Sequence, residues 1–344
     1  MYSGFVKAVA ATAVASSLFS AQMSVASEVN IYSYRQEFLI RPLLDAFQDS
    51  TGIKVNVVSA NSGLLERLEN EGRNTPADIL LTSDIGPLFD AKTRDLIVSF
   101  DSATIKANVP AQYRDEDSTW VGLTARSRII YASKDRVAEG EIKQYEDLAD
   151  PKWAGRICTR SGKHSYNLSL IGSMIEYHGM EETENWLAAL KQNLARKPQG
   201  NDRSQVKAIS EGQCDLALGN TYYFGAMITN ESEPEQKEWA NSVNIVFPNQ
   251  QDRGAHMNIS GAAITRYAPN PSEALQLLEF LTSQEAQRIY AEVNFEFPVR
   301  PGVQRSELIN EYMSDFIADD ISLTRIAARR TDASKMVDRV GFDN

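Results

Sequence analysis

Two adjacent tyrosines and a third, distant one are the residues whose types and spacing are best suited to chemistry. Residues 215–218 predict a buried strand, and Asn220-Thr221-Tyr222-Tyr223 comes directly after it. Tyr166 has the matching position in another unit, after a predicted strand ending at Arg160 and at the start of a predicted helix. Ligand sites of open α/β sheets lie outside the carboxyl ends of the strands. We therefore expect the three phenols to line one cleft.

Phenol oxygens in such a cleft would suit a hard trivalent cation. A neutral tyrosine is a poor ligand, with a reference pKa of about 10. A metal ion as acidic as Fe³⁺ displaces the phenol proton, and oxygen ligands select hard ions over soft ones. On spacing alone a second interpretation stays open, because tyrosine pairs are also common as amphipathic core and rim residues.

Other kinds of chemistry find little support in the sequence. It contains no Gly-x-Ser-x-Gly elbow, no Gly-x-Gly-x-x-Gly and no phosphate-binding Gly-Lys-Ser/Thr loop. The three histidines, His164, His178 and His256, are far apart and lack the His-Glu-x-x-His spacing of a zinc site. We therefore expect a protein that is not an enzyme, and we keep a secreted enzyme or redox protein as an alternative from another class.

The elements around these residues alternate between strands and helices. Residues 29–34, 53–58 and 77–82 predict strands, and residues 38–50 and 62–70 between them have the apolar spacing of helices. This order favours a sheet covered by helices on both faces. A second unit of the same kind follows. Its predicted strands are 121–132, 157–160, 215–218 and 259–264, and its predicted helices are 166–178, 183–194, 204–211, 272–281 and 283–293.

No Gly/Ser-rich or Pro-rich linker separates the two units. We therefore expect two lobes joined by the strands themselves, with hinges near residues 121–131 and 258–263.

The N-terminus has the pattern of a secretory signal. Lys7 provides a positive charge, residues 8–15 are apolar, and Ser24-Val25-Ala26 places small residues where a signal peptidase cleaves. We expect residues 1–26 to be removed, with a retained membrane anchor as the alternative. The formal net charge is −11. This makes nucleic acid an improbable partner, because nucleic-acid binding needs basic patches.

The two cysteines, Cys158 and Cys214, are an even pair in a chain predicted to be exported. An oxidising compartment favours a disulfide between them. Two separate buried thiols are the alternative.

The chain resembles the ferric-ion-binding periplasmic proteins of the bacterial transferrin group, which have the type II periplasmic-binding fold. The segment most specific to that family is Asn220-Thr221-Tyr222-Tyr223. The likeness extends over nearly all of the predicted mature chain. It is also carried by residues 29–36, 51–55, 76–82, 148–156, 198–202 and 247–250.

The resemblance implies an α/β protein with two lobes, each a mixed, mainly parallel sheet flanked by helices, and a ligand in the cleft between them. It predicts a first lobe of residues 27–124 plus about 259–300, and a second of 125–258 plus about 301–344. It implies a monomer in the periplasm that binds Fe³⁺ and delivers it to the permease of an ABC importer. An organic solute such as a polyamine, thiamine or phosphonate is the alternative cargo within this fold.

The resemblance also implies a ligand set. It gives Tyr222 and Tyr223 the role of Fe³⁺ ligands, and Lys163-His164-Ser165-Tyr166-Asn167 matches a segment that adds a third phenolate in one branch of the family. The first loop departs from the family, because Gln36 and Glu37 stand where other members have His or His-Tyr. Gln36 is a weak ligand for Fe³⁺, and Glu37 is a possible ligand that could instead face solvent. We therefore expect tyrosine ligands completed by carbonate, bicarbonate or water.

Three arginines are further candidates for the cleft. Arg126 and Arg128 resemble arginines that line it in the family, and strand alternation puts both on one face. Arg35 is a similar candidate behind the ligands. Arginine near a phenol favours the phenolate and an accompanying anion, although each of the three could instead form an ordinary surface salt bridge.

Overall fold

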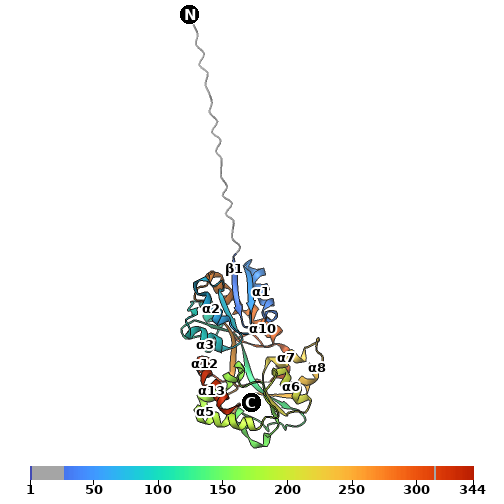
Figure 1. The fold of residues 1–344 in the computed structure, drawn as a ribbon. Helices are drawn as coiled ribbons and strands as arrows, with labels where there is room; N and C mark the ends of the chain where they lie inside the picture. The colour runs from blue at the N-terminus through green and yellow to red at the C-terminus, as the bar shows by residue number, and fades with distance from the viewer. Residues whose placement is uncertain (2–26, 314) are drawn as a thin grey trace.

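The computed structural model describes residue 1, residues 27–313 and residues 315–344, so most of the predicted signal lies outside the described residues. The described chain forms two lobes stacked end to end (Figure 1). Helices α1, α2, α3 and α10 surround the sheet of one lobe, and α5, α6, α7, α8 and α13 surround that of the other. The two-lobed α/β architecture predicted from the sequence is confirmed.

The sheet of the first lobe is built on the N-terminal strand. Strand β1 (Glu28–Ser33) pairs in parallel with β2 (Lys54–Ser59) and with β3 (Ile79–Thr82). Helix α1 (Glu37–Thr51) connects β1 to β2 and buries one apolar face, with Leu43, Leu44 and Phe47 inward. It ends at Gly52, whose φ of 73° is the left-handed conformation that glycine adopts without steric cost. The first-lobe elements follow from amphipathic patterns, as predicted.

Two long strands connect the lobes. Strand β5 (Val121–Ser133) pairs with β9 (Met257–Thr265) through residues 121–127, and then with β7 (Leu216–Asn220) and β8 (Val243–Val246) through residues 128–133. Strand β9 pairs on its other side with β3. Every residue of β5 and of β9 is buried. Both predicted hinges fall within these strands, and hinge bending itself stays a prediction.

The sheets are mixed, as predicted, and the antiparallel pairs run through the two connecting strands. Parallel pairing joins β1 to β2 and β3, and β6 (Ile157–Cys158) to β7, while the pairs formed by β5 with β7, β8, β9 and β10 (Phe297–Pro298) are antiparallel. Parallel pairing is therefore less dominant than expected. The βαβ order along the chain predicts the parallel pairs, but it does not reveal the direction in which a strand returns from the other lobe.

The second lobe contains a long helix whose interruption was predicted from the sequence. Helix α5 (Ser165–Gln192) is interrupted at Gly179, which has a φ of 78° and a ψ of 176°. The break lies between the two helices predicted at 166–178 and 183–194. Three helices follow in this lobe: α6 (Asp202–Ser210), α7 (Tyr222–Ile228) and α8 (Glu235–Asn241).

The remaining elements complete both lobes. In the first part of the chain they are α2 (Leu64–Glu71), α3 (Ile85–Thr93), β4 (Ile97–Val98) and α4 (Ala103–Asn108). Helices α9 (Pro271–Leu281) and α10 (Gln284–Asn294) follow β9, and α11 (Glu307–Tyr312), α12 (Leu323–Ala328) and α13 (Arg330–Val340) end the chain. Short 3₁₀ helices span Gly72–Asn74, Ala111–Tyr113, Tyr145–Ala149 and Pro151–Trp153.

Cys158 and Cys214 form the predicted disulfide, with their Cα atoms 5.9 Å apart. Cys158 ends β6, and Cys214 lies just before β7, the strand that pairs with β6. The disulfide therefore links two positions that are 56 residues apart in the sequence. In the part of the chain that the structure describes, none of the helices combines the length and the apolar character needed to cross a membrane.

Candidate metal site

The tyrosine pair lies where β7 ends and α7 begins. Two hydrogen bonds to the connecting strand β5 fix this turn. The Thr221 amide donates to the carbonyl of Ser127 at 3.1 Å, and the Ser127 amide donates to Thr221 Oγ1 at 3.4 Å. Tyr222 and Tyr223 are the first residues of α7, and their ring centroids are 4.4 Å apart. The turn therefore brings both phenols to the same side, as the sequence predicted for a strand-to-helix junction.

Tyr166 meets this pair from the start of α5. His164 precedes the helix, and its Nδ1 accepts a hydrogen bond from the Tyr166 amide at 3.3 Å. The hydroxyl oxygens of Tyr166 and Tyr222 are 3.0 Å apart. The structure thus brings together three phenols from two helices that are distant in the sequence.

The surroundings of the tyrosine pair hold the phenols in their neutral form. Desolvation raises the pKa of Tyr222 well above its ordinary value, and the neighbouring phenols of Tyr166 and Tyr223 raise it further. The pKa of Tyr223 is raised for the same reasons, with Asp202 adding to the effect. A strongly Lewis-acidic cation is therefore needed to convert these phenols to phenolates at neutral pH.

Three guanidinium groups surround the ring of Tyr166. The guanidinium carbons of Arg126, Arg128 and Arg160 lie 5.6, 5.9 and 5.3 Å from its centroid. Arg126 and Arg128 share a face of β5, as strand alternation predicts. Sequence reasoning did not single out Arg160, although its place at the end of a predicted strand was a signal. Burial opposes the charge of Arg160, but Asp202 and, after it, the phenols of Tyr223 and Tyr166 hold its pKa above the ordinary value.

A buried carboxylate balances part of this positive charge. Asp202, at the start of α6, accepts from Arg128 Nη1 at 2.9 Å and lies 3.4 Å from Arg160. Arg128 also donates to the side-chain oxygens of Asn167 and Asn220, at 2.8 and 3.1 Å. Removing one partner of such a buried pair leaves an uncompensated charge, which is strongly destabilising. Asp202 was part of a segment that carried the family resemblance, but its pairing could not be read from the sequence.

The first lobe contributes a second arginine–carboxylate pair. Arg35 is buried and donates to both carboxylate oxygens of Glu296, at 3.1 and 2.6 Å, and it also contacts Ser260. Burial opposes the charge of Arg35, but Glu296 holds its pKa above the ordinary value. Tyr222 also contributes to this effect. Arg126 Nη1 donates to the hydroxyl of the same Ser260 at 3.4 Å, so Arg35 lies beside an arginine of the tyrosine site.

Gln36 and Glu37 lie at the start of α1. Gln36 precedes α1 and is exposed, and Glu37 is the first residue of the helix. The carboxylate of Glu37, which is half exposed, pairs with Arg41 one turn further along.

His256 is a polar residue of the site that sequence reasoning did not identify. It is 2 % exposed and helps line a small gap with Arg126, Arg128 and Tyr166, and neither of its ring nitrogens has a hydrogen-bond partner. The side-chain nitrogen of Asn220, which lines the same gap, also has no partner. Burial lowers the pKa of His256 to about 3, with Arg128 and Arg126 contributing, so its ring is neutral.

The described residues contain no cluster of three or more His, Cys, Asp or Glu side chains able to hold a metal ion. The donor set at this site consists of phenol oxygens, which suits a hard cation.

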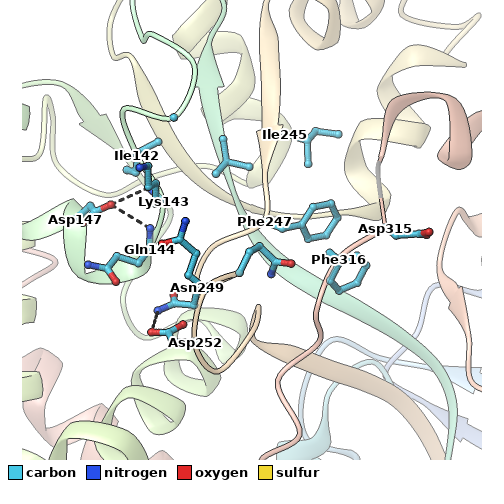
Figure 2. A pocket seen from close by; sticks show the side chains of 14 residues that line it. Ile142, Lys143, Gln144, Asp147, Ile245, Phe247, Asn249, Asp252, Asp315 and Phe316 are labelled. Atoms are coloured by element: carbon cyan, nitrogen blue, oxygen red, sulfur yellow. Dashed lines mark hydrogen bonds between the residues drawn. The ribbon is translucent and has the colours of Figure 1, made fainter.

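A separate hollow lies at the free edge of the second-lobe sheet. Its volume is about 590 Å³, and its lining includes Phe247, Phe316, Asp147 and Asp252. Figure 2 shows Phe247 and Phe316 on one side, with Asp315 near them, and Asp147 and Asp252 on the other. The rings of Phe247 and Phe316 stack with their centroids 4.0 Å apart. The carboxylates of Asp147 and Asp252 accept hydrogen bonds from residues three or four positions before them in the sequence. None of the three tyrosines lines this hollow, so it is distinct from the tyrosine site.

Comparison with known families and structures agrees with this geometry. Residues 74–322 match a family described as bacterial extracellular solute-binding protein. The chain belongs to this family of solute-binding proteins. The match covers more than half of the chain and includes all three tyrosines.

Several of the similar proteins have names or ligands that refer to iron. Iron uptake protein A1 of Synechocystis is 40 % identical to this solute-binding protein over 316 residues, which is 92 % of this chain and 87 % of the relative. A solved structure of Mannheimia haemolytica ferric iron-binding protein A in an open conformation is 48 % identical, with a TM-score of 0.86, covering 93 % of this chain and 100 % of that one. A Trichodesmium protein in complex with iron and citrate ligands is 39 % identical, with a TM-score of 0.87, covering 92 % and 100 %.

Proposed function

We propose that this solute-binding protein captures Fe³⁺ in the periplasm and delivers it to the permease of an ABC importer. The observation that carries the proposal is the 3.0 Å approach of the Tyr166 and Tyr222 hydroxyls, with the ring of Tyr223 4.4 Å from that of Tyr222. Three neighbouring phenols form a ligand set that a hard trivalent cation can deprotonate. We assign Tyr166, Tyr222 and Tyr223 as the ligands.

The charges around the site support an accompanying anion. Three phenolates would neutralise Fe³⁺. Among the described residues, the four arginines Arg35, Arg126, Arg128 and Arg160 pair with three carboxylates, those of Asp84, Asp202 and Glu296. The surplus positive charge favours a small anion such as carbonate or bicarbonate in the remaining coordination positions. The ring nitrogens of His256 and the side-chain nitrogen of Asn220 have no hydrogen-bond partner, so they are available to contact this anion. Citrate is another candidate, because one relative's structure contains it with iron.

Binding and release would use the two-lobed fold. We propose that the lobes are residues 27–124 with about 259–300, and 125–258 with about 301–344. Bending within β5 and β9 would then close them on the metal, since hinge closure around a ligand requires only a few residues to change conformation. We also propose that residues 1–26 direct export and are removed, and that the protein acts as a monomer.

Organic cations fit the site less well than iron. An amine would need free carboxylates and an aromatic box, whereas Asp202 and Glu296 are already paired with arginines. The positive charge around Tyr166 would also repel a polyamine.

The experiment that tests the function is titration of Fe³⁺ from a weak chelator, followed through the visible phenolate-to-iron absorption band. Wild-type protein should bind one iron and become coloured. Tyr222→Phe and Tyr223→Phe keep the rings but each removes a ligand oxygen, so the fold should persist while affinity and band fall sharply. Tyr267→Phe is the matched control, since Tyr267 is 39 % exposed and its ring contacts Arg73, remote from the site. If both site variants keep the band and the affinity of wild type, the metal site lies elsewhere.

A further inference from the structure

The turn that follows α10 contacts both sides of the metal site. Helix α10 packs against α1 in the first lobe, and its C-terminal end reaches α7, the helix that begins with the two tyrosines (Figure 1). Asn294 donates to the carbonyl of Leu39 in α1 at 3.0 Å. Two residues later, Glu296 holds Arg35 by a bidentate ion pair. Phe295 lies between these two anchored residues.

The ring of Phe295 packs directly against the tyrosine helix. Its contact in α7 is Gly225, two residues after Tyr223. A Cβ atom added at position 225 would lie 2.7 Å from Cβ and 2.9 Å from Cδ1 of Phe295. These separations are shorter than any ordinary van der Waals contact, so glycine is the residue that permits this approach. The contact crosses from a first-lobe helix to a second-lobe helix.

Phe295 adopts a backbone conformation that a phenylalanine rarely has. Its φ is 58° and its ψ is 22°, in the left-handed region where a residue with a Cβ atom is sterically disfavoured. A glycine or asparagine would fit this position at less cost. Strained conformations of this kind persist where the surrounding structure over-determines them, and they are concentrated at functional sites. The strain here directs the aromatic ring onto α7.

We propose that Phe295 is a positioning residue that holds α7, and with it Tyr222 and Tyr223, in the arrangement that binds iron. The proposal rests on the proposed iron-binding function. Because Phe295 is anchored through Asn294 and Glu296 to the first lobe, its ring couples the tyrosine helix of one lobe to Arg35 of the other. Loss of the ring lets α7 shift, and a small misplacement of the ligand oxygens weakens binding and speeds iron release.

The test uses the full mature chain with Phe295→Gly, Gly225→Ala and the double variant. Phe295→Gly removes the ring and relieves the left-handed strain, so the iron-free protein should keep its thermal midpoint. Iron should nevertheless leave it about tenfold faster when a strong chelator is added, which is within the usual range for coupling between sites. Val293→Ala is the control, because Val293 is on the same helix and is 46 % exposed.

The double variant distinguishes a direct contact from general damage. Gly225→Ala alone should weaken iron binding and shift the visible band, because its methyl group collides with the ring. Once the ring is absent, the same methyl group has room, so Gly225→Ala should add little to Phe295→Gly. Equal release rates and bands in Phe295→Gly and wild type, or fully additive losses in the double variant, would overturn the proposal while leaving the iron function intact. Failure of wild-type protein to bind iron would instead remove the proposed function, and this inference with it.

Discussion

Iron affinity should fall steeply and continuously as the pH is lowered. Tyrosine phenols have a reference pKa of about 10, and desolvation raises the pKa of Tyr222 and Tyr223 above that value. A raised pKa means that these phenols are protonated throughout the neutral range in the iron-free protein. Each must therefore lose a proton when Fe³⁺ binds, and protons compete with the metal.

The number of phenols sets the size of this effect. With three ligands, the logarithm of the apparent affinity should change by about three for each pH unit, which is about 4 kcal/mol because one pKa unit corresponds to 1.36 kcal/mol. The perturbation is a change of pH between about 6 and about 8 at fixed bicarbonate concentration, a window below the ordinary phenol pKa.

The assay is competition with a chelator whose own proton and iron constants are known. Tyr222→Phe should reduce the slope from about three to about two, since one fewer proton is released. A wild-type slope near zero or one would refute a site made of three phenol ligands.

Three further predictions follow from individual contacts. Intact-mass measurement of the denatured, non-reduced protein should show no alkylation at Cys158 or Cys214, and two freely alkylated thiols would exclude the bond in the native protein. Replacing both cysteines by serine should lower the free energy of unfolding by about 4 kcal/mol, the value that the chain-entropy model gives for their separation in the sequence. Gln36→Ala should change iron affinity only modestly, because Gln36 is exposed before α1, and a loss as large as that of Tyr222→Phe would show that this loop supplies a ligand. Arg160→Gln should weaken iron binding and raise the pH needed for half-saturation, because it removes a cation that stabilises the phenolates; an unchanged pH profile would show that Arg160 only pairs with Asp202.

The parts of the site that the sequence reveals are those set by local geometry. Tyr222 and Tyr223 follow a strongly apolar strand, and a ligand position after such a strand is a general property of open α/β sheets. Arg126 and Arg128 share a face because strand side chains alternate. Tyr166 could be placed at the start of a helix because it also follows a predicted strand. Its contact with Tyr222 could not be predicted, because that contact depends on how α5 packs in the second lobe.

Contacts between distant segments could not be read in the same way. Arg35 and Glu296 are 261 positions apart, and no pattern near either residue identifies its partner. His256 stands in an extended segment just before β9, and nothing local indicates that its ring is buried without a hydrogen-bond partner. The left-handed turn at Phe295 is hidden for a related reason, since the sequence there lacks the glycine that usually marks such a turn.

The most direct test of the account is a crystal structure of the iron-loaded protein, with the metal located by anomalous scattering at the iron absorption edge. We predict a single strong peak bonded to the hydroxyl oxygens of Tyr166, Tyr222 and Tyr223, with a small anion on the side of Arg126 and Arg128. An iron peak bonded to other side chains, or to only one of the three phenols, would contradict it.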